Sequence, residues 1–317
     1  MTDLAAAALD DAWPPPDWLP SAVWPRPSGG AHVEWSEPDA NWPGHPLYVS
    51  PTSRPSGLLW RMDLEAFVDA APPAAPPTGF IFHMSRCGST LAARMLATRP
   101  GDVVVSEAPP LDDIVQLAAP SEAERARRLI AMVAGLGRSR APDGRFMVKL
   151  DSWHTLALPL FRRAFPATPW VFLYREPARV VASHMREPGM HTVHGMMPAG
   201  LFACETSPPA PREDFVAQVL AEVCAAVLDH LPLGGGRLVN YDALPDAVWT
   251  EILPHFGEAA CAGDLEAMRR AAEVDAKATH QGFQPQPMGG VTDALRGATK
   301  RYLTEVYEAL EGARRAQ

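Results

Sequence analysis

Lysine is nearly absent from this sequence. It supplies only three of the 28 cationic side chains, at Lys149, Lys277 and Lys300, and the other 25 are Arg. Set against 37 acidic residues, these cations leave a net charge of −9. General binders of nucleic acids or anionic membranes need a basic field, so the composition excludes both as partners. Any anion that this chain binds is therefore held mainly by guanidinium groups.

Cysteine and long apolar runs are scarce as well. The four cysteines form no Cys-x-x-Cys pair and no His–Cys cluster with zinc spacing, which argues against a disulfide framework and a metal centre. The N-terminus lacks a cationic start with a long apolar run, and no stretch of about 18 apolar residues occurs. We therefore expect no signal peptide, no transmembrane helix and no metal, and we expect a cytoplasmic protein.

Proline, in contrast, is abundant and unevenly placed. Residues 1–77 hold 15 of the 34 prolines, six of the nine tryptophans, and ten acidic against three basic side chains. Proline blocks helix interiors and central strands, whereas tryptophan needs a surface to bury against. We predict an irregular arm over 1–77, with one helix at 62–70 and a stiff connector at 72–77. The arm would pack on the main domain, 78–317, or on a partner, including a second copy of the chain.

From residue 78 onward, short apolar runs alternate with amphipathic segments. The expected strands are 80–82, 103–105, 146–148, 170–174 and 237–241. The expected helices are 90–96, 121–135, 155–164, 177–186, 211–230, 244–256, 262–273 and 291–312. Strands that alternate with helices predict an α/β fold with a mostly parallel sheet of about five strands covered on both faces.

Charged residues follow several of these strands. In open α/β sheets, ligands bind outside the carboxyl ends of the strands. The residues that follow strands are Arg86, Glu107, Lys149, Asp151 and Arg175, with His154 close behind. The sequence therefore gathers three cations and two carboxylates at one edge of the predicted sheet.

The segment 83–90, His-Met-Ser-Arg-Cys-Gly-Ser-Thr, leads from the first strand into a helix. Backbone N–H groups of such a loop, added to a helix N-terminus, make an anion cradle. Gly88 allows a close approach to phosphate, and the fork of Arg86 suits phosphate or sulfate. The loop lacks the first Gly and the Gly-Lys-[Ser/Thr] ending of a Walker A motif. It therefore predicts an anion site and disfavours an ATP kinase.

A second pattern, Arg175-x-Pro177 followed by Ser183, lies at the fourth strand–helix junction. Pro177 suits the first position of a helix. Arg175 would lie just outside that helix and Ser183 two turns into it, so both could reach one anion.

The two patterns, in this order and on these elements, resemble those of the PAPS-dependent sulfotransferases (PAPS is 3′-phosphoadenosine 5′-phosphosulfate). Softer matches are Val148-Lys149, the segment 160–175 and Arg237–Leu244. The resemblance covers about 79–260 and implies a P-loop-like three-layer sandwich, PAPS as donor with PAP as product, and no metal. It assigns the 5′-phosphosulfate to Ser85, Arg86, Cys87, Gly88, Ser89 and Thr90, and the 3′-phosphate to Arg175 and Ser183.

Sulfuryl transfer needs in-line geometry, neutralised oxygens and a base for the acceptor. The resemblance implies sulfation of a hydroxyl or amine on a small-molecule or glycan acceptor. Lys149 is interpreted as a second cation near the sulfonate or the acceptor. Three residues stay open as the base: Glu107 ranks first, Asp151 second and His154 third.

Other interpretations stay open beside this one. The chain could be a P-loop kinase or NTPase with a degenerate loop, or a non-catalytic nucleotide-binding scaffold. Cys87 stands at a helix N-terminus, a position that lowers a thiol pKa and would suit a nucleophile. The Met- and Gly-rich stretch 184–204 and the segment 281–290 are expected to be loops, the first of them over the acceptor site.

Overall fold

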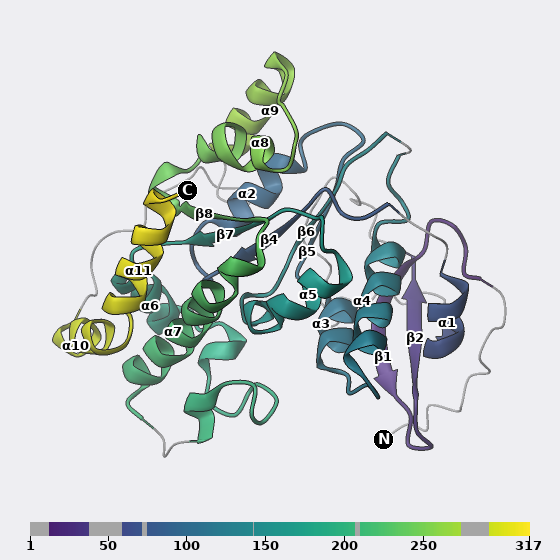
Figure 1. The fold of residues 1–317 in the computed structure, drawn as a ribbon, viewed down its shortest axis with the longest axis horizontal. Helices are drawn as coiled ribbons and strands as arrows, with labels where there is room; N and C mark the ends of the chain where they lie inside the picture. The colour runs from purple at the N-terminus through teal and green to yellow at the C-terminus, as the bar shows by residue number, and fades with distance from the viewer. Residues whose placement is uncertain (1–12, 38–58, 72–74, 142, 207–209, 274–291) are drawn as a thin grey trace.

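A computed structural model describes residues 13–37, 59–71, 75–141, 143–206, 210–273 and 292–317 (Figure 1). Its strands form a three-stranded and a five-stranded sheet. The strands are β1 Leu19–Pro25, β2 Ala31–Ser36, β3 Leu59–Asp63, β4 Gly79–His83, β5 Val103–Ser106, β6 Phe146–Lys149, β7 Trp170–Tyr174 and β8 Gly236–Asn240.

The helices are distributed along the whole described chain. They are α1 Leu64–Ala70, α2 Ser89–Leu96, α3 Pro109–Gln116, α4 Glu122–Leu136, α5 Leu158–Ala164, α6 Pro177–Arg186, α7 Arg212–His230, α8 Leu253–His255, α9 Ala262–Ala272, α10 Asp293–Tyr302 and α11 Thr304–Arg315. Shorter turns are η2 Ser152–Ala157, η3 Met190–Thr192, η4 Ala203–Thr206, η5 Leu231–Leu233, η6 Tyr241–Ala243 and the π-helical η7 Val248–Ile252.

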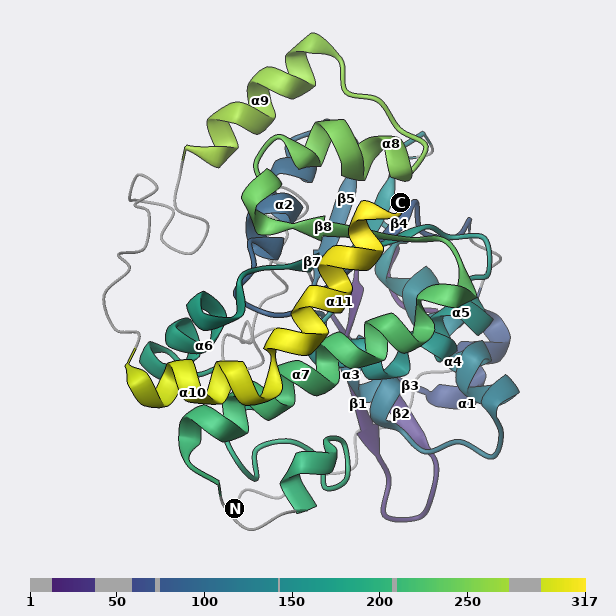
Figure 2. The same ribbon diagram turned by 60° about the vertical axis from the view of Figure 1, so that its left-hand side comes forward.

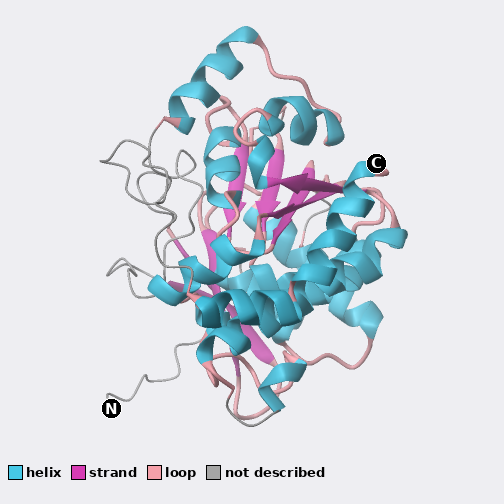
Figure 3. Cartoon of the chain, turned by 90° about the vertical axis from the view of Figure 1, so that its left-hand side faces the viewer, coloured by secondary structure: helices cyan, strands magenta, loops and turns pink. Residues whose placement is uncertain are grey.

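The larger sheet has the order β5-β6-β4-β7-β8, and all its strands are parallel. Every residue of β4 and β7 is buried, as expected for apolar strands covered on both sides. Figure 3 shows these strands between helices. In Figure 2, α2, α8 and α9 lie to one side of the sheet and α7 and α11 to the other. The predicted α/β fold with a parallel sheet of five strands, a P-loop-like sandwich, is confirmed.

The strand order has a topological switch point at β4. The chain passes from β4 to β5 and β6 on one side, and then to β7 and β8 on the other. Ile81 of β4 pairs with Lys149 of β6, and Phe82 pairs with Phe172 of β7. The segments that follow β4, β6 and β7 therefore share the position where ligands bind in open α/β sheets.

The N-terminal region is more regular than predicted. Its described part contains the antiparallel sheet β1-β2-β3, where the sequence predicts an irregular arm. The helix predicted at 62–70 is confirmed as α1. Strand β1 lies against α3 and α4, and Trp35 joins the same core as the larger sheet. The described part of this region thus contacts the rest of the chain, whereas the division of the chain at residue 77 stays a prediction.

Two further predictions need correction or fall outside the described residues. The helix predicted over 291–312 is two helices, α10 and α11, which meet at Leu303, a residue buried in the core. The loop 281–290 and much of the connector 72–77 lie outside the described residues. Helix α7 with η5, Arg212–Leu233, has the length and composition to cross a membrane, but it packs against α10, α11 and η2.

Asp113 ties the N-terminal sheet to α3. Its carboxylate accepts the backbone N–H of Val23 in β1 at 2.8 Å. Burial, with Asp112 beside it, raises the pKa of Asp113 to about 6 although this hydrogen bond opposes the shift. The charged form is therefore penalised in the folded state, and stability falls as pH rises toward and through 6.

We expect Asp113→Asn to stabilise the protein at pH 8 and to do so much less at pH 4. The amide keeps an acceptor for Val23 without a buried charge, and the gain should be about 1 kcal/mol or less after solvent screening. Urea unfolding at both pH values measures it, with the exposed Asp229→Asn as control. A loss of stability at pH 8 would contradict this account.

Candidate active site

The loop between β4 and α2 has an unusual backbone. Ser85, Arg86 and Gly88 have positive φ values of 77°, 49° and 83°. The backbone N–H groups of Arg86, Cys87 and Gly88 make no hydrogen bond within the described part of the chain. Successive N–H groups in such conformations form a concave nest for anions, and α2 adds its N-terminus. The loop thus has the backbone conformation of such a nest, and its binding of an anion stays a prediction.

Strained backbone is concentrated at this edge of the sheet. Among the described residues, positive φ outside glycine occurs at Ser85, Arg86 and Glu107. All three follow strands of the larger sheet at their carboxyl ends. Each such conformation costs on the order of 1–3 kcal/mol and persists where the surrounding structure enforces it, which happens most often at functional sites.

Gly88 lies directly against the segment that follows β8. A Cβ atom at Gly88 would stand 2.6 Å from Leu244 Cδ1 and 3.0 Å from Tyr241 Cδ2. The ring of Tyr241 in turn carries the guanidinium of Arg175 at 3.9 Å from its centroid. The loop, Tyr241 and Arg175 therefore form one continuous surface.

Arg175 is held at this surface without a carboxylate partner among the described residues. It is 9% exposed, and its Nε atom is buried with no hydrogen-bond partner. A guanidinium on an aromatic face is stabilised by the cation–π interaction and keeps its donors free for an anion. Ser183, the second residue of the predicted pattern, is buried two turns into α6.

The side chain of Arg86 reaches Glu187, the residue that follows α6. Its Nη1 donates to Glu187 Oε2 at 3.0 Å, and its Nη2 donates to the Glu187 carbonyl at 2.9 Å. The guanidinium thus joins the loop to the end of α6. In this conformation the loop offers its backbone N–H groups to an anion, whereas the guanidinium of Arg86 forms an ion pair with Glu187.

Cys87 is a core residue, which corrects the suggestion of a reactive thiol. Its Sγ donates to the Leu173 carbonyl at 3.1 Å, and its side chain is fully buried. Burial raises the pKa of the Cys87 thiol to about 11 although the charges of Lys149 and Arg175 oppose the shift. The helix N-terminus does not outweigh desolvation here. The two opposing charges show that both cations lie near the loop.

Lys149 is completely buried at the end of β6 and pairs with Glu107, which follows β5. The Glu107 carboxylate also lies 3.4 Å from His83 Nε2, and its backbone N–H donates to the Lys149 carbonyl at 2.8 Å. Although burial opposes the shift, Lys149 and His83 hold the pKa of Glu107 well below its usual range. The side chain ranked first as the base is thus a stabilised anion in an ion pair.

The other two candidate bases lie after β6, on and next to η2. Asp151 precedes η2, and His154 is buried within it. His154 contacts Asp112 of α3, a residue that the sequence analysis missed. Atoms of Asp112, Asp151 and His154 lie within 4.8 Å of one another. The sequence signal that could have identified Asp112 was its acidic side chain in the segment that follows β5, which forms α3.

The stretch 184–204 is partly ordered by its histidines. His191 Nε2 lies 3.3 Å from Ser152 Oγ, and His184 Nδ1 accepts the backbone N–H of Gly189 at 3.2 Å. Burial, together with nearby cations, lowers the pKa of both rings to about 3. Among the described residues, this pair belongs to no group of three metal-binding side chains.

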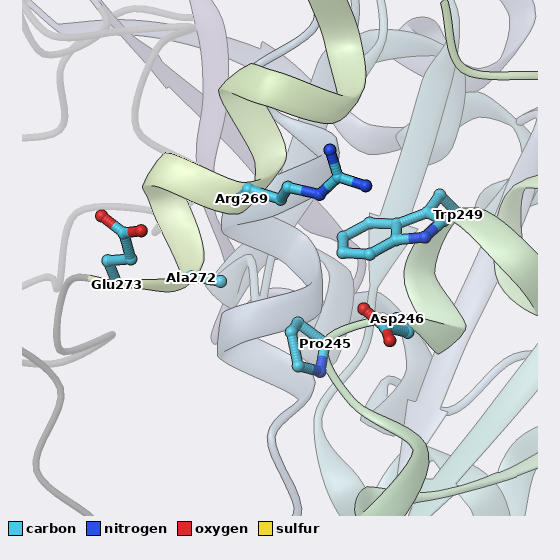
Figure 4. A pocket seen from close by; sticks show the side chains of 6 residues that line it. All are labelled: Pro245, Asp246, Trp249, Arg269, Ala272 and Glu273. Atoms are coloured by element: carbon cyan, nitrogen blue, oxygen red, sulfur yellow. The ribbon is translucent and has the colours of Figure 1, made fainter. Parts of the chain in front are cut away.

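An open cleft of about 580 Å³ is lined by residues that follow Leu244 and by residues of and next to α9 (Figure 4). Pro245, one of the residues that line the cleft, directly follows Leu244 in the chain. Because the side chain of Leu244 lies against Gly88, the cleft is close to the loop after β4. Arg269 stacks on the ring of Trp249 at 5.4 Å from the centroid. Its lining residues are Pro245, Asp246, Trp249, Arg269, Ala272 and Glu273.

We expect Gly88→Ala to destabilise the fold more than Gly257→Ala. Both glycines have positive φ, 83° and 75°, but a Cβ at Gly257 meets nothing within 4 Å. The control should lose about 1 kcal/mol from backbone strain. Gly88→Ala should lose about 2–3 kcal/mol, since Leu244 and Tyr241 must also move. Equal losses in urea unfolding would show that the loop does not pack as described.

No family model and no curated protein matches this chain. Solved structures that it is similar to include sulfotransferases. The sulfotransferase domain from the curacin biosynthetic pathway is 13% identical, with 72% of this chain and 98% of that chain covered and a TM-score of 0.45. Sulfotransferase STF9 from Mycobacterium avium is 14% identical, with 76% and 81% covered and a TM-score of 0.48.

Mouse sulfotransferase SULT7A1, solved in complex with PAP, is 9% identical, with 80% of this chain and 93% of that chain covered and a TM-score of 0.42. The chain thus resembles sulfotransferases in its overall structure, as its two motifs do in sequence.

Proposed function

We propose that this protein is a sulfotransferase that takes PAPS as its donor. The observation that carries the proposal is the pairing of an anion cradle with a partly unpartnered arginine. Among the described residues, none accepts a hydrogen bond from the three cradle N–H groups, and none bonds the buried Nε of Arg175, which lies beside the cradle on Tyr241. Two neighbouring anion sites of this kind suit a nucleotide with phosphate groups at both its 5′ and 3′ positions.

Different residues would bind the different groups of PAPS. The N–H groups of residues 86–88, with Ser85, Ser89 and Thr90 around them, would hold the 5′-phosphosulfate. Arg175 and Ser183 would hold the 3′-phosphate. The cleft at Trp249 would take the base, since an indole face stacks on a purine. When bound, PAPS supplies the sulfuryl group that is transferred.

Charge neutralisation would come mainly from fixed dipoles and arginine. The cradle N–H groups would stabilise negative charge that develops on the leaving phosphate, an interaction that costs no reorganisation during the reaction. The ammonium of Lys149 is buried in its ion pair with Glu107. Lys149 would therefore influence the site by stabilising the charge of Glu107. The acceptor would be a hydroxyl or amine of a small molecule or glycan, and the enzyme would work in the cytoplasm without a metal.

Ligand-induced thermal stabilisation tests this function. We expect PAP and PAPS to raise the melting temperature, because a ligand that binds only the folded state stabilises it by mass action. ATP with Mg²⁺ should have little effect, because the loop lacks the Walker A lysine. Stabilisation by ATP–Mg²⁺ alone would favour a kinase. Binding of PAP without sulfation of any acceptor in a broad panel would favour a scaffold.

We expect Arg175→Ala to weaken PAP binding by about 10- to 100-fold, the loss of a charge-assisted hydrogen bond. Binding of adenosine 5′-phosphate, which has no 3′-phosphate, should change by less than about threefold. Calorimetric titration of both ligands measures the difference. Arg179→Ala, an exposed arginine in the first turn of α6, four residues after Arg175, is the matched control. An equal loss for both ligands would contradict the role given to Arg175.

A further inference from the structure

A chain of hydrogen bonds connects α3 to the turn that follows β6. Asp112 Oδ1 of α3 accepts from Trp153 Nε1 at 2.7 Å and from His154 Nε2 at 2.8 Å. His154 Nδ1 accepts the backbone N–H of Asp151 at 3.3 Å. Asp112 thus reaches the backbone N–H of Asp151 through one imidazole ring, and ligand atoms of the three side chains lie within 4.8 Å of one another.

The directions of these bonds settle the state of the ring. Because the N–H of Asp151 donates to Nδ1, that nitrogen carries the lone pair. Nε2 then carries the proton and donates to Asp112. His154 therefore has no free lone pair, either for an acceptor proton or for a cation. This excludes it as the base in the described arrangement and makes it a rigid spacer between Asp112 and Asp151.

Asp151 stands closer to the anion cradle in the sheet order than Glu107 does. It follows β6, which pairs directly with the cradle strand β4, whereas Glu107 follows β5, one strand farther out. The carbonyl of Leu150, the residue before Asp151, accepts a hydrogen bond from His83 Nε2 at 2.8 Å. Asp151 is therefore joined to the strand that leads into the cradle.

The groups that face Asp151 come from β5, β6, α3 and η2. Burial has the largest effect, and the carboxylates of Glu107 and Asp112 add to it. The charge of Lys149 acts in the opposite direction, and the His154 ring would do so only when protonated. Together they raise the pKa of Asp151 to about 7. Such a carboxylate is basic enough to take a proton near neutral pH. Glu107 is not, since Lys149 stabilises its charged form.

We infer that Asp151 is the general base of this site and that Asp112 and His154 are its positioning residues. The inference rests on the proposed sulfotransfer. In that step the acceptor O–H or N–H bond breaks and its proton passes to the Asp151 carboxylate. The acceptor atom forms a bond to sulfur, the bond between sulfur and the bridging oxygen breaks, and PAP leaves with that electron pair. No other reactant is needed.

A carboxyl titration tests the electrostatic part without any ligand. In protein labelled with ¹³C at the aspartate carboxyl carbons, NMR should show Asp151 titrating near pH 7. Its signal is assigned by its loss in Asp151→Asn. Asp112→Asn keeps the acceptor for His154 but removes a charge, so the midpoint should fall by about half a unit or more. Asp113→Asn, on the same helix but bonded to Val23, should leave the midpoint in place. A midpoint near 4, or one that Asp112→Asn does not move, would overturn the inference.

Turnover tests the chemical part, with PAPS as donor and water as acceptor so that no natural acceptor is required. Asp151→Asn should lower PAP formation by about 100-fold or more, and PAP affinity should stay within about twofold. In Asp112→Asn the acidic limb of the pH–rate profile should move to lower pH by the shift seen in NMR. A purely structural role for Asp112 would lower the rate without moving this limb.

Two outcomes separate this inference from the proposed function. If wild-type protein binds no PAP, the sulfotransferase proposal fails, whatever the titration shows. If PAP binds and Asp151→Asn turns over PAPS like wild type while Glu107→Gln does not, the donor is right and the base is Glu107. Circular dichroism of each variant confirms that it is folded.

Discussion

The buried ammonium of Lys149 constrains the whole edge of the sheet. A charge at this depth must be paired, because leaving it alone would cost several kcal/mol. Glu107 supplies the pair, and it does so from a residue with a left-handed φ of 52° at the end of β5. The ion pair fixes Glu107 as an anion and leaves the neighbouring carboxyl, Asp151, as the group that titrates near neutral pH.

The three cations of this edge have three different environments. Lys149 is neutralised by Glu107, and Arg86 is engaged by Glu187. Arg175 has an aromatic ring in place of a carboxylate. A chain with net charge −9 can therefore still offer a local anion site. Its attraction comes from one stacked arginine and from backbone dipoles, and it needs no basic surface.

The N-terminal sheet shows where composition misleads. Its prolines argue against strands, yet Pro20 and Pro25 belong to β1, an edge strand with an irregular register between Pro20 and Ala22. Proline is tolerated on edges and at bulges, where no ladder hydrogen bond is lost. Trp35 behaves as predicted for a tryptophan that needs a surface, since it is buried against Trp13 and Phe67.

The sequence by itself determined the parallel sheet, the small-residue turn that leads into α2 and the set of charged residues after the strands. These follow from local patterns: apolar runs such as 170–174, a small-residue turn at Gly88, and polar residues where strands end. Only the tertiary structure decided which of those side chains pair with one another. Pairing of Lys149 with Glu107, of Arg86 with Glu187 and of His154 with Asp112 joins segments far apart in the chain. Such pairings depend on which side chains the fold brings together, and the pKa of each carboxyl group depends on that geometry and on its burial.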